Sequence, residues 1–279
     1  MIIERHNAQQ YTLSIRVSAD GFCFAVHHPQ RADEYAFQPY APDPLLPVVA
    51  NLRQAREALP MLQHHYACVQ LLLADAPYEV IPAPFAGAET ADDAPALMDD
   101  GGRTPVTIRF APDSSLSAWV RATWPDARIV PGIWPVVRFA LRFGLGVRGE
   151  RLGLEAATNT PNPSPLTSNP TTLCHLHGRS MDVISIRDGR LQFVNTFDVP
   201  TAVTALYYLM GTWQTLGLSQ TDDELVIVGR SPIERELKAK ATRFIHHVRE
   251  PRSADLFHTT ELARLSAVPF DLQALVGFS

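Results

Sequence analysis

Near the start of the chain, hydrophobic and polar positions alternate with a period of two on both sides of a short polar break. The alternating apolar residues are Ile15, Val17, Phe22, Phe24 and Val26. A period of two is typical of strands, and the Asp-Gly pair inside the break is a common hairpin turn. The pattern predicts a hairpin with its turn at residues 18–21, and a third strand near residues 35–37.

Farther along, the pattern predicts a series of helices and strands. Apolar residues at three- and four-residue spacing predict helices, whereas short, nearly all-apolar runs are typical of buried strands. The predicted helices cover residues 44–59, 116–124, 134–143, 203–216 and 233–248, the last beginning after Ser231-Pro232. The predicted strands cover residues 66–74, 106–110, 127–130 and 225–228.

Two stretches interrupt this series. Residues 82–105 are rich in Pro, Gly, Ala and acidic residues, and we expect a loop insertion there. Residues 149–172 carry four prolines and predict a linker or long loop. Strand-turn-strand pattern then returns, with turns at Gly178-Arg179 and Asp188-Gly189. We therefore expect a first half at residues 1–148 and a second half at residues 173–279, each opening with a hairpin.

Composition narrows the class of protein. A chain of 279 residues is long enough for two domains. The net charge of -5 gives no electrostatic case for nucleic acid, and no apolar run approaches the roughly 20 residues needed to cross a bilayer. The opening MIIERHNAQQ has no signal-peptide hydrophobic region, and three widely spaced cysteines fit a reducing compartment. We expect a cytoplasmic protein; its oligomeric state stays open.

Three segments resemble a known family: LSIRVSADGFCFAV, MDVISIRDGRLQFVNTF and DDELVIVGRSP. Together they resemble the actin-like family known as domain of unknown function 3822. The C-terminal half is also similar to type IV pilus assembly adaptors of the actin-like ATPase superfamily. The resemblance implies an α/β protein with a duplicated actin-like (ribonuclease H-like) fold. It also implies two subdomains, each with a mixed sheet flanked by helices, and a cleft between them.

In superfamily members that use ATP, the hairpin turns carry residues that bind magnesium and phosphate, and the resemblance implies where these positions lie here. In each of two hairpins an acidic residue organises magnesium-bound water, and a glycine lets backbone N–H groups approach a phosphate. When the chain is aligned on the strands that follow each turn, Arg16 takes the acidic position and Ser18 the glycine position of the first hairpin. In the second hairpin His175 and His177 take these positions, with Gly178 next to them.

A third turn, typically Gly-Gly after a buried strand, lies against adenosine in these relatives. Here Gly229 is kept and Arg230 replaces the second glycine, followed by Ser231. The replacements oppose the chemistry, because Mg²⁺ relies on oxygen ligands, arginine is a permanent cation and histidine suits softer metals. Side chains at glycine positions also block close backbone approach. The resemblance therefore implies a degenerate nucleotide site, a pseudo-ATPase with no catalytic residue and no required cofactor, although ATP stays open as a ligand.

The candidate cleft residues are Arg16, Ser18, Asp20, Gly21, His175, His177, Gly178, Arg179, Gly229, Arg230 and Ser231. Asp20-Gly21 is better explained as a turn than as a phosphate site. Arg16 with Arg179 or Arg230 could neutralise an anion without metal, or be ordinary salt-bridged side chains. His175 and His177 share one face of a predicted strand, but no third ligand is evident, so we predict no metal site.

The leading hypothesis is a non-catalytic adaptor or scaffold that binds a protein partner of unknown identity. An alternative is a regulator that binds a nucleotide or phospho-ligand through arginines in place of magnesium. A kinase-type or ATPase enzyme of the same superfamily ranks last, because the acidic and glycine positions are replaced.

Overall fold

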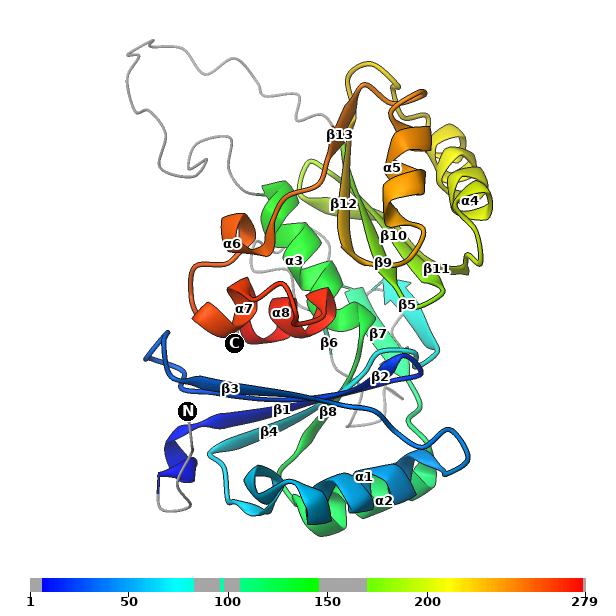
Figure 1. The fold of residues 1–279 in the computed structure, drawn as a ribbon. Coiled ribbons are helices and arrows are strands. Elements are labelled where there is room, and N and C mark those ends of the chain that lie inside the picture. Colours follow the sequence, from blue (N-terminus) through cyan, green and yellow to red (C-terminus); the bar gives the residue numbers. More distant parts are fainter. Residues whose placement is uncertain (1–6, 83–95, 98–105, 146–169, 278–279) are drawn as a thin grey trace, which may run out of the picture.

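The computed structural model describes residues 7–82, 96–97, 106–145 and 170–277. They form two lobes, each built on a five-stranded mixed sheet, and a group of helices lies between the lobes (Figure 1). Within this described part of the chain, no helix has the length and apolarity needed to span a membrane.

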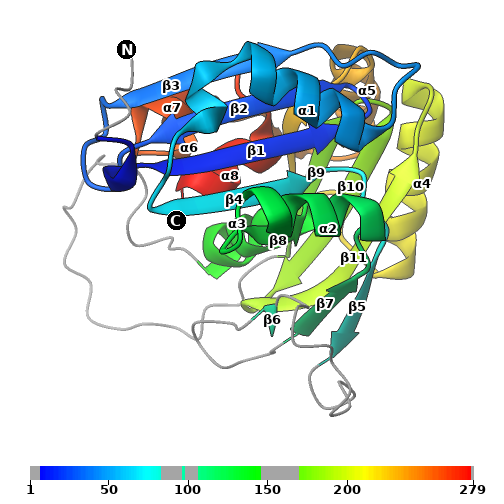
Figure 2. The same cartoon turned by 90° about the horizontal axis from the view of Figure 1, so that it is seen from below.

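The first lobe contains the N-terminal hairpin. Its sheet consists of β1 (Thr12–Ser18), β2 (Gly21–His27), β3 (Tyr35–Tyr40), β4 (Cys68–Leu73) and β8 (Arg128–Pro131), in the order β3-β2-β1-β4-β8. Helices α1 (Val48–Ala58) and α2 (Ser114–Thr123) cover its outer face (Figure 2). Two 3₁₀ turns, η1 (Ala8–Gln10) and η2 (Pro60–Gln63), and a small sheet of β5 (Tyr78–Pro82), β6 (Ala96–Leu97) and β7 (Val106–Phe110) complete this part.

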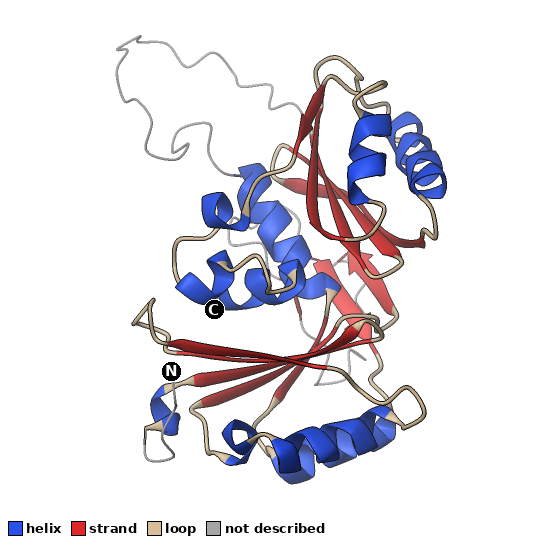
Figure 3. Cartoon of the chain, in the orientation of Figure 1, coloured by secondary structure: helices blue, strands red, loops and turns tan. Residues whose placement is uncertain are grey.

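The second lobe repeats this plan. Its sheet consists of β9 (Thr171–His177), β10 (Ser180–Arg187), β11 (Arg190–Asp198), β12 (Glu224–Arg230) and β13 (His247–Arg249), in the order β11-β10-β9-β12-β13. Helices α4 (Ala202–Thr215) and α5 (Glu234–Ala241) cover its outer face (Figure 3). In both lobes an antiparallel hairpin meets a parallel strand beside its first member. The two sheets are therefore equivalent strand by strand.

The helices between the lobes are α3 (Ile133–Leu145), α6 (Ser253–Leu256), α7 (Glu261–Arg264) and α8 (Phe270–Gly277) (Figure 1). Because side chains alternate between the two faces of a strand, the two faces of the first sheet contact different helices. In the first hairpin Leu13 and Ile15 pack with α1 and α2, whereas Cys23 and Ala25 belong to a core shared with α3 and α8. That central core also takes Ile184 from the second lobe. The C-terminal helices therefore hold the inner faces of both sheets.

Most of the predicted elements are present within a few residues, including all three hairpin turns. The helix predicted at 233–248 is wrong in its second half, because α5 ends at Ala241 and Val248 lies in β13, paired with β12. Ser231 does not cap α5, whose N-cap is Ile233. Instead the Ser231 hydroxyl donates to the Gly178 carbonyl at 3.2 Å. Pairing with a distant strand overrides local helix propensity here.

The two predicted loop regions lie largely outside the described residues. At their edges, β5 reaches Pro82, residues 96–97 pair with β7, and Thr171 and Thr172 belong to β9. The division of the chain near residues 149–172 stays a prediction.

Candidate functional site

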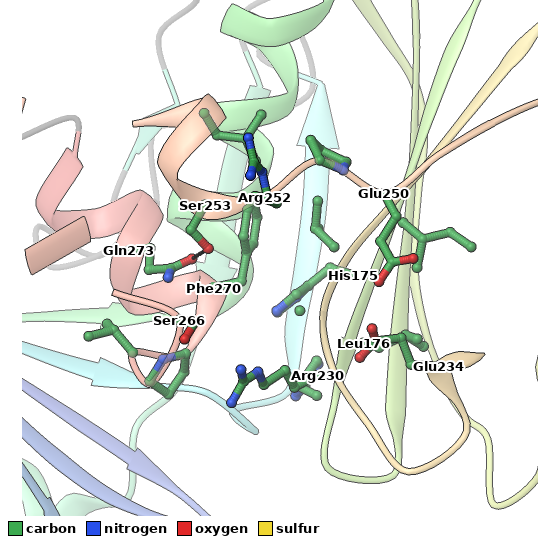
Figure 4. Close-up of a pocket in the computed structure, with 18 of the residues that line it drawn as sticks. His175, Leu176, Arg230, Glu234, Glu250, Arg252, Ser253, Ser266, Phe270 and Gln273 are labelled. Atoms are coloured by element: carbon green, nitrogen blue, oxygen red, sulfur yellow. Dashed lines mark hydrogen bonds between the residues drawn. The ribbon is translucent and has the colours of Figure 1, made fainter. Parts of the chain in front are cut away.

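A pocket of ≈ 320 Å³ lies between the second sheet and the C-terminal segment (Figure 4). One wall comes from the ends of β9 and β12, including His175 and Arg230. The opposite wall comes from residues 250–273, including Arg252 and Phe270. Arg16 of the first lobe also lines the pocket, so both hairpins contribute to it.

Arg16 is the side chain that joins the first hairpin to the C-terminal helix. It is buried, and its Nε donates to both carboxylate oxygens of Asp271 in α8 at 2.8 Å. Its Nη1 donates to Asp20 in the turn at 2.9 Å, while its Nη2 is buried without a hydrogen-bond partner. Burial alone would lower the pKa of Arg16, but Asp271 and Asp20 raise it above its ordinary value. Arg16 is therefore a fully charged cation neutralised by two carboxylates.

Asp75, just beyond β4, holds the turn of the first hairpin. Its Oδ2 accepts from the Ser18 hydroxyl at 2.9 Å and from the Ala19 backbone N–H at 2.6 Å. Its Oδ1 lies 3.8 Å from Nδ1 of His177 in the second lobe. A Cβ added to Gly178 would lie 3.9 Å from the Asp20 side chain. The tips of the two hairpins therefore face each other, with Asp75 between them.

The second hairpin contains a buried His-His-Asp cluster. Asp182 Oδ2 lies 2.8 Å from His175 Nδ1 and 3.3 Å from His177 Nε2. Asp182 Oδ1 accepts from the Thr196 hydroxyl at 2.6 Å, and Thr196 is in turn bonded to the Tyr78 hydroxyl at 2.9 Å. The strand register explains the cluster, because Asp182 stands directly opposite His175 in the β9–β10 pair.

Charge in this cluster follows from its contacts. Burial opposes ionisation of Asp182, but hydrogen bonds from His175 and His177 outweigh it and hold the Asp182 pKa well below its usual range. Burial would lower the pKa of His177, yet its bond to Asp182 and the nearby carboxylates raise that pKa above its ordinary value. Asp182 is therefore a buried carboxylate.

The third turn is closed by backbone packing. Gly229 has a φ of 87°, and a Cβ added there would lie 2.2 Å from the Leu176 carbonyl oxygen. Only glycine fits this left-handed conformation without strain. The glycine thus allows β12 to approach β9 closely at the edge of the pocket.

The structure brings together only some of the candidate residues. Those that line the pocket are Arg16, Asp20, His175, His177, Gly229 and Arg230. Those that do not are Ser18, Gly21, Gly178, Arg179 and Ser231. Among these, Arg179 is largely exposed, and its Nε lies 3.7 Å from Oδ1 of Asp198. Gly21 lies in the turn of the first hairpin with a φ of 135°. What any of these residues binds stays a prediction.

Sequence reasoning missed Asp75, Asp182 and Asp271 as partners. Asp182 was within reach, because a turn at Gly178-Arg179 places it opposite His175. It supplies the third ligand that was missing: His175, His177 and Asp182 each offer a ligand atom, and these atoms lie within 4.8 Å of one another. For Asp271 the local signal was Pro269 before an acidic first turn, which indicates the start of a helix. That signal does not indicate which residue the Asp271 side chain contacts.

Comparisons with known proteins agree with this architecture. A protein of unknown function from Bacteroides thetaiotaomicron with an actin-like ATPase fold superposes with a TM-score of 0.74, at 21% identity over 99% of both chains. A PilM–PilN type IV pilus biogenesis complex gives a TM-score of 0.55, at 12% identity over 95% of this chain and 97% of the other. The chain thus has the actin-like fold that its sequence implied.

At the level of sequence, no curated protein matches the chain. The family model described as "Protein of unknown function (DUF3822)" matches residues 3–142 and 157–248, most of the length. The chain therefore belongs to this family of actin-like proteins.

Proposed function

We propose that this protein is a non-catalytic actin-like adaptor or scaffold that binds a protein partner and does not turn over ATP. The observation that carries the proposal is the buried ion pair between Arg16 and Asp271. The carboxylate of Asp271 already forms an ion pair with Arg16, the cation of the first hairpin. An incoming phosphate would have to displace it, and breaking a buried ion pair is strongly unfavourable.

The charge around the hairpins supports the same proposal. Asp20 and Asp271 contact Arg16, whereas Asp75 and Asp182 contact His177. Ser18 joins the two groups into one network, since its hydroxyl donates to Asp75 and accepts from the Asp20 N–H. Among the described residues of that network, Arg16 is the one side chain with a permanent positive charge. An excess of negative charge disfavours a polyphosphate. Two buried imidazoles beside Asp182 are also poor ligands for Mg²⁺, which prefers oxygen.

The known relatives support a protein partner. The PilM–PilN structure is an assembly of two proteins in type IV pilus biogenesis. At 12% identity the likeness indicates only a shared fold, and fold alone does not supply function. It supports the proposal only in that a protein with this fold takes part in that assembly.

A second candidate is a regulator that binds a phospho-ligand, and one specific observation favours it. Nη2 of Arg16 is buried without a hydrogen-bond partner, and Arg16 lines the pocket together with Arg230. A buried unsatisfied donor favours an oxygen acceptor. This candidate needs the ligand to bind despite the carboxylate of Asp271.

Thermal unfolding of the pure protein with millimolar ATP or ADP, with and without Mg²⁺, separates the two candidates. A ligand at a hundred times its dissociation constant would stabilise the protein by about 2.7 kcal/mol, an easily measured shift. The adaptor proposal predicts no shift and no ATP hydrolysis. A shift seen in the wild type and absent from Arg16→Met, which removes the charge but keeps a long side chain, would favour the phospho-ligand instead.

The partner is tested separately by affinity capture from the source cells, followed by reconstitution. The proposal expects a captured protein to reassemble with this chain from the two purified components at a fixed stoichiometry. If no captured protein forms such a complex, the adaptor proposal is wrong even when nucleotides do not bind.

A further inference from the structure

The His-His-Asp cluster of the second hairpin has the donors of a metal site. His175 and His177 lie on one face of β9, and their rings stack with centroids 4.8 Å apart. Asp182, on the neighbouring strand, faces both. All three are buried, with exposures of 2%, 8% and 4%. We propose that His175, His177 and Asp182 bind a divalent transition-metal ion, in the first instance Zn²⁺.

The spacing of the donor atoms is close to what a tetrahedral ion requires. Ligands about 2.0–2.1 Å from Zn²⁺ stand about 3.3–3.4 Å from one another. The His177 Nε2–Asp182 Oδ2 distance is 3.3 Å and the His175 Nδ1–Asp182 Oδ2 distance is 2.8 Å. The widest separation of the three donor atoms is 4.8 Å. For the three atoms to surround one ion, the widest pair would have to approach by about 1.4 Å.

Outer contacts orient these donors as they do in metal sites. A metal-bound histidine usually gives its other ring N–H to a carboxylate, and a ligating carboxylate is itself hydrogen-bonded. Here Nδ1 of His177 lies 3.8 Å from Asp75, an ion-pair contact longer than a hydrogen bond, while Oδ1 of Asp182 accepts from Thr196 at 2.6 Å. Tyr78 in turn holds Thr196. Nδ1 of His177 and Oδ1 of Asp182, the atoms that would not bind the ion, therefore already contact other residues.

The electrostatics favour a cation at this position. The carboxylates of Asp20, Asp75, Asp182 and Asp271 exceed the single guanidinium of Arg16 in the network described above. A divalent ion bound to the buried carboxylate of Asp182 would offset that excess. Since imidazole suits Zn²⁺ and other transition metals better than Mg²⁺, the donor set selects the former.

The position of the cluster leaves one coordination site open. His175 and His177 line the pocket, and Figure 4 shows the His175 ring extending into it. A fourth ligand from water, or from a bound partner, can therefore reach the ion. The inference goes beyond the proposed adaptor role and holds whether or not a nucleotide binds.

The test is metal titration of untagged, chelator-stripped protein, with Zn²⁺ followed by calorimetry and Co²⁺ by visible absorption. We expect one ion per chain and a rise in melting temperature of the zinc-loaded protein. His177→Gln and Asp182→Asn should each weaken binding by at least about tenfold. Asp75→Asn, which changes the contact to His177 and also the hydrogen bonds from Ser18 and Ala19, should weaken binding by about tenfold. A double variant His246→Gln/His247→Gln, at two exposed adjacent histidines, should bind as the wild type does.

Two results would overturn the proposal. One is wild-type affinity no tighter than that of the His175→Gln/His177→Gln variant. The other is loss of binding in the His246→Gln/His247→Gln control. Since changes in the cluster can unfold the lobe, X-ray absorption of the zinc-loaded His246→Gln/His247→Gln protein gives a measurement with the site intact. Two imidazole ligands per zinc are expected there, and fewer than two would contradict the site.

Discussion

Arg16 in β1 and His175 in β9 occupy equivalent positions of two equivalent sheets. Each is the third residue from the end of the first hairpin strand, and each pairs with the third residue of the second strand: Arg16 with Cys23, and His175 with Asp182. Both side chains are buried and both are bonded to a carboxylate. The source of that carboxylate differs.

For His175 the partner lies seven positions away, directly across the hairpin. For Arg16 the partner, Asp271, lies 255 positions away on α8. His175 therefore finds its carboxylate within its own hairpin, whereas the bidentate partner of Arg16 comes from the C-terminal segment that docks between the lobes. This difference suggests that the first hairpin is the more fragile of the two.

The largest effect should come from Asp271→Ala. It leaves the buried guanidinium of Arg16 with Asp20 alone, and we expect a loss of about 3–5 kcal/mol in the free energy of unfolding, measured with urea. Arg16→Met/Asp271→Leu should recover part of the loss, since an apolar pair leaves no uncompensated charge. As a control, Asp255→Ala removes a half-buried partner of the exposed Arg252 and should leave stability essentially unchanged. Wild-type stability for Asp271→Ala would mean that the first hairpin does not depend on α8.

A second difference between the lobes lies at the far end of the hairpins. His27 pairs with Thr12 in the first lobe, and the equivalent residue of the second lobe is Ile186, paired with Thr171. His27 is buried with its Nδ1 unpartnered, and burial lowers its pKa from 6.5 to about 4. The folded state thus binds this proton less readily than the unfolded state does. His27 therefore contributes stability that is present above pH 6.5 and lost as the pH falls toward 4.

We expect His27 to account for a loss of roughly 3 kcal/mol between pH 7 and pH 4. His27→Ile, which copies the residue of the second lobe, should flatten that part of the stability curve, followed by urea unfolding at each pH. Equal slopes for the variant and the wild type would show that folding does not lower the pKa of His27.

The smallest effect concerns the strand beside each hairpin. Gly229 pairs with Leu176 in the second lobe, where the first lobe has Leu73 paired with Val17. Gly229→Ala should destabilise the protein by at least about 2 kcal/mol, because the residue has a positive φ and its Cβ would meet the backbone of β9.

Gly211→Ala is the matched control, since Gly211 lies in α4 and its Cβ would enter open space. There alanine should be neutral or slightly stabilising. Thermal unfolding of both variants is sufficient, and equal melting temperatures would contradict the close approach of β12 to β9.

Turn residues, helix caps and hydrophobic periodicity predicted most helices and strands where these signals agree with the tertiary contacts. Asp20-Gly21 and Asp188-Gly189 are both turns, the latter with positive φ at both residues, and Asp113 caps α2 by accepting from the Leu116 N–H. The helix predicted at 233–248 failed because pairing with β12 outcompetes helix at residues 247–249. At the candidate site the register of the hairpin could have identified Asp182 as the partner of His175, although the sequence analysis missed it, whereas nothing near Arg16 implied Asp271.

By itself, the sequence determined the two hairpins, the duplicated α/β plan and the family, because turn chemistry and hydrophobic period act over a few residues. Only the tertiary structure decided which charges meet. Docking of α8 between the lobes places Asp271 on Arg16, and approach of the hairpin tips places Asp75 beside His177. Such contacts depend on how separately formed elements pack around a shared core, and no local pattern encodes that packing.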